Sequence, residues 1–141
     1  MQFTLEELSK KLGLEFTGNG KTVISHVCGL EKITAGGLAY IKNPGEIANL
    51  PTPSGIFNNK KKTLDDVEIP VEAALIVSNE LKSTKHNLLL SNDPMAHHVE
   101  ATHLLIDDFK SSGEVHKEAY VADNVILGKN VTVDPKAVIY D

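Results

Sequence analysis

The stretch VHKEAY VADNVI LGKNVT VDPKAV IYD, residues 115–141, divides into hexapeptides that each begin with an aliphatic residue. The first positions hold Val115, Val121, Leu127, Val133 and Ile139, and the fifth positions hold the small or branched Ala119, Val125, Val131 and Ala137. A period of six predicts a β-helix in which three hexapeptides form one triangular coil, with the first-position side chains inside. We expect the coil to wind left-handed, against the usual crossover rule. An antiparallel hairpin with chance alternation is the alternative.

Upstream of the repeat, residues 1–107 predict an α/β domain, and residues 108–114 predict a linker. Thr4 and Glu7 have the spacing of a capping box, which indicates a helix over residues 4–12 that Gly13 ends. Apolar runs predict strands at 14–16, 23–27, 38–41, 73–77 and 88–90. The run at 73–77 is continuous, so we expect it to be buried on both faces.

Asp93 and Pro94 suit the N-cap and the first turn of a second helix. We expect the inward face of this helix to hold Met95, Val99, Thr102 and Ile106. A short helix at 46–50 and a short strand at 55–58 are the other elements expected, within connections that are otherwise loop.

The net charge of −5 over 141 residues excludes a dominant basic surface, so nucleic acid is not an expected partner. The one basic cluster, residues 60–62, reads as a solvated loop, with binding of phosphate or of an acyl carrier as the alternative. The longest apolar run is too short to span a bilayer, and no signal peptide opens the chain. We expect a cytoplasmic protein in which Cys28 is a buried structural thiol rather than a nucleophile.

Three histidines, His97, His98 and His103, raise the question of a metal site. Helical ligand pairs lie three or four residues apart, whereas these histidines are one, five and six apart. Glu100 lies three residues from both His97 and His103, but a chelate needs three convergent ligands. We therefore expect no metal and no cofactor.

Three stretches carry a family resemblance: LEELSKKLG at 5–13, GLAYIKNP at 37–44, and the junction from NDP at 92–94 to VHKEA at 115–119. Over its whole length the chain resembles the LpxD family, the UDP-3-O-acylglucosamine N-acyltransferases of lipid A synthesis. The hexapeptides alone indicate only an acyltransferase-like β-helix, and the middle segment with Asn43 and Pro44 points to this family.

The resemblance implies that residues 1–107 bind the uridine of a nucleotide sugar and that residues 115–141 begin a left-handed parallel β-helix. In the family, an aromatic side chain stacks on uracil and an asparagine hydrogen-bonds to the base. Tyr40 and Asn43 occupy these positions, and Pro44 stiffens the segment. A second aromatic wall is common three residues after the asparagine, where this chain has Glu46. Alternatively, Tyr40 is simply a half-buried strand residue.

The reaction implied is transfer of a 3-hydroxyacyl chain from acyl carrier protein to the 2-amine of UDP-3-O-acylglucosamine. The family's catalytic base is a histidine that would lie beyond Asp141, so no residue here is assigned a catalytic role, and His116 reads as structural. Full-length members are homotrimers. We expect this chain to be a fragment and a monomer or weak oligomer, because a β-helix needs about three repeats for stability. A noncatalytic nucleotide-sugar-binding or assembly module is the alternative function.

Overall fold

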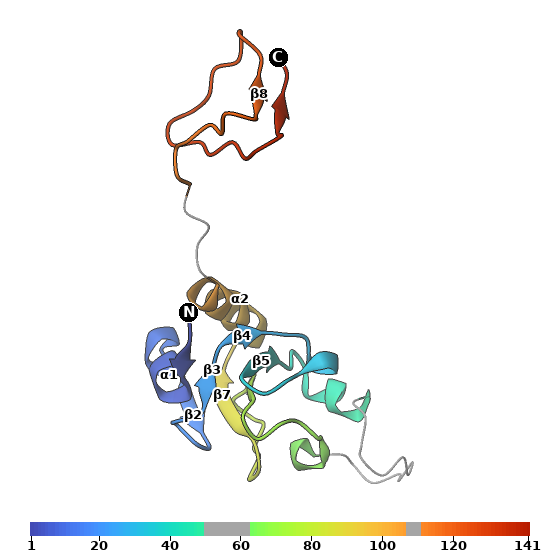
Figure 1. Cartoon of the computed structure of the whole chain (residues 1–141). Coiled ribbons are helices and arrows are strands. Elements are labelled where there is room, and N and C mark those ends of the chain that lie inside the picture. The colour runs from blue at the N-terminus through green and yellow to red at the C-terminus, as the bar shows by residue number, and fades with distance from the viewer. Residues whose placement is uncertain (50–62, 107–110) are drawn as a thin grey trace. The chain divides into compact units, whose positions relative to one another are not determined.

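The computed structural model describes residues 1–49, 63–106 and 111–141. The chain divides into two compact units, Met1–Asp107 and Asp108–Asp141 (Figure 1). The strand expected at 55–58, the lysine cluster at 60–62 and the first part of the expected linker lie outside the described residues.

The first unit is built on a five-stranded mixed sheet with the order β2-β7-β6-β5-β4. These strands span Glu15–Thr17 (β2), Asn87–Ser91 (β7), Ala74–Ser78 (β6), Gly37–Tyr40 (β5) and His26–Val27 (β4). β4 to β7 run parallel to one another, and β2 is an outer strand that runs antiparallel to β7. The mixed sheet with its helices makes this unit α/β.

The strand expected at 23–27 is wrong as a single element. β3 (Val23–Ile24) pairs antiparallel with β1 (Phe3–Thr4) in a separate two-stranded sheet, whereas β4 belongs to the large sheet. The break falls at Ser25, whose backbone N–H donates to the Gly36 carbonyl oxygen at 2.9 Å. An apolar run shows that residues are extended but does not show which partner each will find.

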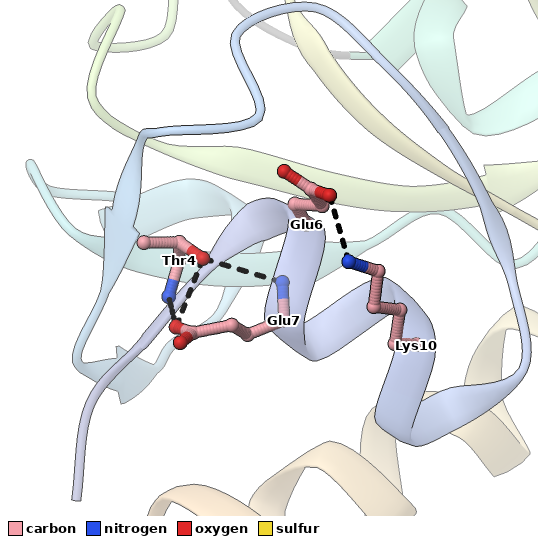
Figure 2. A network of polar contacts seen from close by, with 4 residues as sticks. All are labelled: Thr4, Glu6, Glu7 and Lys10. Carbon is pink, nitrogen blue, oxygen red and sulfur yellow. Dashed lines mark hydrogen bonds and ion pairs between the residues drawn. The ribbon is translucent and has the colours of Figure 1, made fainter.

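The first helix, α1, spans Leu5–Leu12, and its capping box is confirmed. The Glu7 N–H donates to Thr4 Oγ1 at 3.2 Å, and the Thr4 N–H donates to Glu7 Oε2 at 2.8 Å (Figure 2). These contacts satisfy donors that a helix start otherwise leaves unpaired. Gly13 ends the helix in the left-handed conformation, with φ 66°.

The large sheet is covered differently on its two faces. One face packs against α1 and α2 (Pro94–Leu105) in a cluster that includes Leu8, Leu38 and Ile76. The other face packs against the 3-10 turns η2 (Pro44–Asn49) and η3 (Leu64–Asp66) through Ile47 and Leu64, while η1 (Leu30–Lys32) adds Leu30. Residues 73–77 are fully buried between the two layers, as predicted.

These 3-10 turns also correct two expectations. The short helix expected at 46–50 is a 3-10 turn that starts at Pro44, and η3 lies in a segment that we expected to be loop. The Thr63 N–H donates to Asp66 Oδ2 at 2.7 Å, a capping contact that was not among the elements expected from the sequence.

The start of α2 is confirmed, but its inward face is wrong. Asp93 Oδ1 accepts from the Ala96 N–H, and Pro94 occupies the first turn. The expected inward residues Met95, Val99 and Ile106 are 44%, 53% and 55% exposed, and Thr102 is only partly buried. The buried side consists of Pro94, Ala101 and Leu105, with His98 partly buried beside them.

The second unit contains β8 (Tyr120–Val121) and β9 (Val138–Ile139), which pair in parallel. Tyr120 faces Val138, Val121 faces Ile139, and an isolated bridge joins Val115 to Val133. All three pairs lie 18 residues apart, which is the length of three hexapeptides. Val133 is buried within the unit, whereas Val115 is 47% exposed.

Three of the hexapeptides in this unit contain a turn at the same position. The fifth-position N–H donates to the second-position carbonyl oxygen in the pairs Ala119–His116, Val125–Ala122 and Ala137–Asp134, at 2.9–3.2 Å. Asn130 and Lys136, both at fourth positions, have positive φ. The strained conformations therefore occur at fourth positions and not at Gly128, where glycine would have tolerated them most easily.

Candidate functional site

The carboxyl ends of the parallel strands β5, β6 and β7 lie side by side, and we call this end of the large sheet its carboxyl edge. Tyr40 is the last residue of β5, and Ser78 and Ser91 are the last residues of β6 and β7. In open sheets of parallel strands, ligands commonly bind outside this edge. We refer to residues 40–46, which leave the sheet here, as the edge segment.

Tyr40 lies on the sheet face that α2 covers. Its ring centroid is 4.8 Å from that of His98, with the planes inclined by 43°. His98 is held in turn by a hydrogen bond from its Nε2–H to the Leu38 carbonyl oxygen, at 3.1 Å. Because a carbonyl oxygen only accepts, the proton must be on Nε2. Tyr40 is therefore a half-buried residue with an aromatic partner on the helix side.

The edge segment is fixed at both ends by apolar anchors. The Ile41 side chain is fully buried, and its N–H donates to the Ile76 carbonyl oxygen at 3.0 Å. Ile47, within η2, is 3% exposed and packs in the same core cluster as Ile41. Between these anchors, Asn43 and Pro44 are exposed to solvent. The arrangement presents polar groups on a short segment whose two ends belong to the core.

Glu46 folds back over the edge segment. Its Oε1 lies 3.5 Å from Asn43 Nδ2, and its Oε2 accepts from the Lys42 N–H at 3.3 Å. The Glu46 N–H also donates to the Asn43 carbonyl oxygen at 3.0 Å. The residue that replaces the expected aromatic wall thus contacts the asparagine that is expected to bind the base.

The histidines at the start of α2 have structural contacts. His97 Nδ1 lies 2.8 Å from Ser91 Oγ and 3.0 Å from the Asp93 carbonyl oxygen, which joins β7 to the helix. Within residues 1–49, 63–106 and 111–141, no three His, Cys, Asp or Glu side chains converge on a common point. Cys28 is half-buried, and burial raises the pKa of its thiol.

The opposite edge of the sheet has a hollow of about 750 Å³. Its lining includes Lys21, Thr22, Lys85, His86 and Asn87. The buried polar groups already bind one another: Asn87 Nδ2 donates to the Val71 and Ala73 carbonyl oxygens, and Asn87 Oδ1 accepts from the Asn19 N–H. These contacts tie the loops at this edge together, and among the described residues no buried side-chain nitrogen or oxygen atom lacks a hydrogen-bond partner.

Asp65 is the centre of a second polar network near this edge. Its carboxylate accepts hydrogen bonds from Ser83 Oγ and from the backbone N–H and Oγ1 of Thr84. These bonds, first from Ser83 and then from Thr84, lower the pKa of Asp65 from its ordinary 3.8 to about 2. The network joins η3 to the loop between β6 and β7.

The contacts of His98 and Glu46 near the candidate site were not expected from the sequence. α2 is apolar on more than one side, so the stripe of residues 95, 99 and 102 competes with the stripe of residues 94, 98 and 101, which has the same helical spacing. His98 in the second stripe could have indicated that this stripe faces the sheet. A histidine on the buried side of a helix can donate a hydrogen bond to a carbonyl oxygen of a strand, as His98 does to Leu38.

Two curated proteins are similar to this chain over most of its length. The chain is 26% identical over 136 residues to a UDP-3-O-acylglucosamine N-acyltransferase of Cytophaga hutchinsonii, covering 92% of this chain and 34% of that protein. It is 28% identical over 129 residues to the protein of the same name from Shewanella frigidimarina, covering 91% and 33%. The chain thus spans about a third of the length of these relatives.

No protein-family model matches the chain. Among the residues that the structure describes, no helix is both long and apolar enough to cross a membrane. The family resemblance carried by residues 5–13, 37–44 and the junction from 92–94 to 115–119 agrees with the name that both relatives have. The chain is therefore distantly similar to two proteins named as UDP-3-O-acylglucosamine N-acyltransferases.

Proposed function

We propose that this chain is the N-terminal, substrate-binding part of an N-acyltransferase that acts on UDP-3-O-acylglucosamine. The observation on which the proposal rests is the similarity of more than nine tenths of the chain to two proteins with that name. In this proposal the first unit binds the uridine, and the second unit begins the β-helix on which acyl transfer takes place.

The uridine site is proposed at the edge segment. Tyr40 provides a flat ring for stacking, and Asn43 provides both a donor and an acceptor for the edge of the base. Stacking of a base on an aromatic side chain contributes on the order of 1–3 kcal/mol. The buried anchors Ile41 and Ile47 support the proposal, because they hold the segment in place before a ligand arrives.

The second unit is proposed to be the start of a left-handed parallel β-helix. The constant offset of 18 residues between paired positions supports three sides per coil. The turn at the same point of three hexapeptides supports corners of one kind.

The reaction proposed for the complete protein is attack of the glucosamine 2-amine on the thioester of an acylated acyl carrier protein. An amide bond forms, the thioester C–S bond breaks, and the carrier thiol leaves. A general base takes the proton from the attacking amine. We propose that the complete protein is a homotrimer and that this base is a histidine outside the present chain.

Uridine binding can be tested by titrating the protein with UMP while following its amide and tyrosine NMR signals. We expect shifts confined to residues 38–46, with a dissociation constant of roughly 1 mM, equivalent to about −4 kcal/mol. Asn43→Ala should weaken binding, whereas Asn19→Ala, at the opposite edge of the sheet, should not. Absence of shifts in residues 38–46 at about 10 mM UMP would refute the uridine site.

A further inference from the structure

We propose that Glu46 determines which pyrimidine the edge segment accepts, by holding the side-chain amide of Asn43 in one orientation. This inference rests on the uridine site proposed above. It gives a role to the residue that replaces an aromatic wall, and it follows from contacts within the segment.

The carboxylate of Glu46 has only acceptor atoms. It faces Asn43 Nδ2 at 3.5 Å through Oε1, while Oε2 is held by the Lys42 N–H at 3.3 Å. If the Asn43 amide were flipped, its Oδ1 would face a negatively charged oxygen and the donor would be lost. The flipped amide is therefore disfavoured, and Oδ1 is directed away from Glu46.

Uracil and cytosine present opposite patterns to such an amide. Uracil has a donor at N3–H beside the acceptor O4, whereas cytosine has an acceptor at N3 beside the donor N4–H₂. A freely rotating asparagine amide can match either base by turning over. With Oδ1 held toward the base, Asn43 can accept from N3–H of uracil but would oppose the N3 lone pair of cytosine.

The alternative is that Glu46 acts only through its charge, as a repulsion on an anionic ligand. Such repulsion would weaken all nucleotides with the same number of phosphates to the same degree. The ratio of affinities for UMP and CMP removes this effect, because the two ligands carry the same phosphate. A change in that ratio therefore reports on amide orientation and not on charge.

The experiment is a pair of NMR titrations, with UMP and with CMP, on the whole chain and on Glu46→Gln. A glutamine side chain can either donate or accept, so it lets the Asn43 amide take both orientations. We expect the native chain to prefer UMP by about tenfold and Glu46→Gln to lower this preference to about twofold or less. Glu72→Gln, which makes the same charge change at the opposite edge, should keep the native ratio.

Glu46→Ala provides a second variant, because it removes the restraint without offering a new hydrogen bond. The backbone bond from the Glu46 N–H to the Asn43 carbonyl oxygen does not need the side chain, so the turn should form in both variants. UMP binding with an unchanged UMP to CMP ratio in both variants would overturn the inference and leave the uridine site standing. Failure of the native chain to bind either nucleotide would instead refute the uridine site, and this inference with it.

Discussion

The imidazole of His98 lies against the phenol ring of Tyr40, with the ring centroids 4.8 Å apart. The two residues come from different layers, since Tyr40 ends β5 and His98 lies on α2. The bond from His98 Nε2–H to Leu38 fixes the imidazole on the same strand that places Tyr40. The orientation of Tyr40 therefore depends on the docking of α2 as well as on the edge segment.

His98→Ala is expected to leave Tyr40 less ordered and to weaken UMP binding by about threefold to tenfold. The reason is the loss of an aromatic contact worth about 0.5–1.5 kcal/mol. His98→Phe should keep most of the affinity, because it retains a ring, although it loses the bond to Leu38. The chain has 3 tyrosines, so NMR of labelled tyrosine can follow Tyr40 directly. His103→Ala, at an exposed position on the same helix, is the control, and an equal effect there would contradict this prediction.

Leu105→Ala and Val99→Ala should differ in their effect on the free energy of unfolding. Leu105 is 4% exposed and packs in the core, so its truncation should cost about 2–5 kcal/mol. Val99 is 53% exposed, so its truncation should change stability by less than about 0.5 kcal/mol. Urea unfolding followed by circular dichroism measures both. A larger loss for Val99→Ala would mean that α2 packs through the face expected from the sequence.

Asp65 should make stability depend on pH in the acid range. Its pKa is about 2 in the folded protein, below the ordinary 3.8. A lowered pKa means that the unfolded chain binds the proton more readily than the folded one. The stabilisation is therefore complete above about pH 4 and is lost as the pH falls through about 2. Asp65→Asn should be less stable than the native chain at neutral pH and should lose less stability on acidification.

The matched control for this titration is Asp134→Asn, in the second unit. Stability measured by urea unfolding at several pH values between about 2 and 6 gives the comparison. If Asp65→Asn and the native chain followed parallel curves through this range, the hydrogen bonds from Ser83 and Thr84 would not be coupled to stability.

Local signals in the sequence predicted the parts of the fold that local physics determines. The capping box of Thr4 and Glu7, the start of α2 at Pro94 and the buried strand at 73–77 are all confirmed. Each depends on residues within one or two turns of each other or on a single apolar run. The hexapeptide period likewise predicted pairing at intervals of three repeats, and the observed offset is 18 residues.

Features that depend on distant partners could not be predicted in the same way. The split of residues 23–27 depends on two different partner strands, β1 and β5. The choice between two apolar faces of α2 depends on how the helix docks on the sheet. Tyr40 and Asn43 were placed by family resemblance, whereas their contacts with His98 and Glu46 emerged only from the structure.

The burial of Ile41 and Ile47 on either side of the exposed residues 42–45 has an evolutionary consequence. Selection for stability acts on the two anchors, because truncating either would leave a cavity in the core. Substitutions at the exposed positions 42–45 escape that selection, since surface changes of this kind seldom alter stability by more than about 0.5 kcal/mol, and the half-buried Glu46 is under weaker selection than the anchors. If the edge segment is the uridine site proposed here, its ligand preference can therefore change through single substitutions such as one at position 46, while the scaffold beneath stays the same.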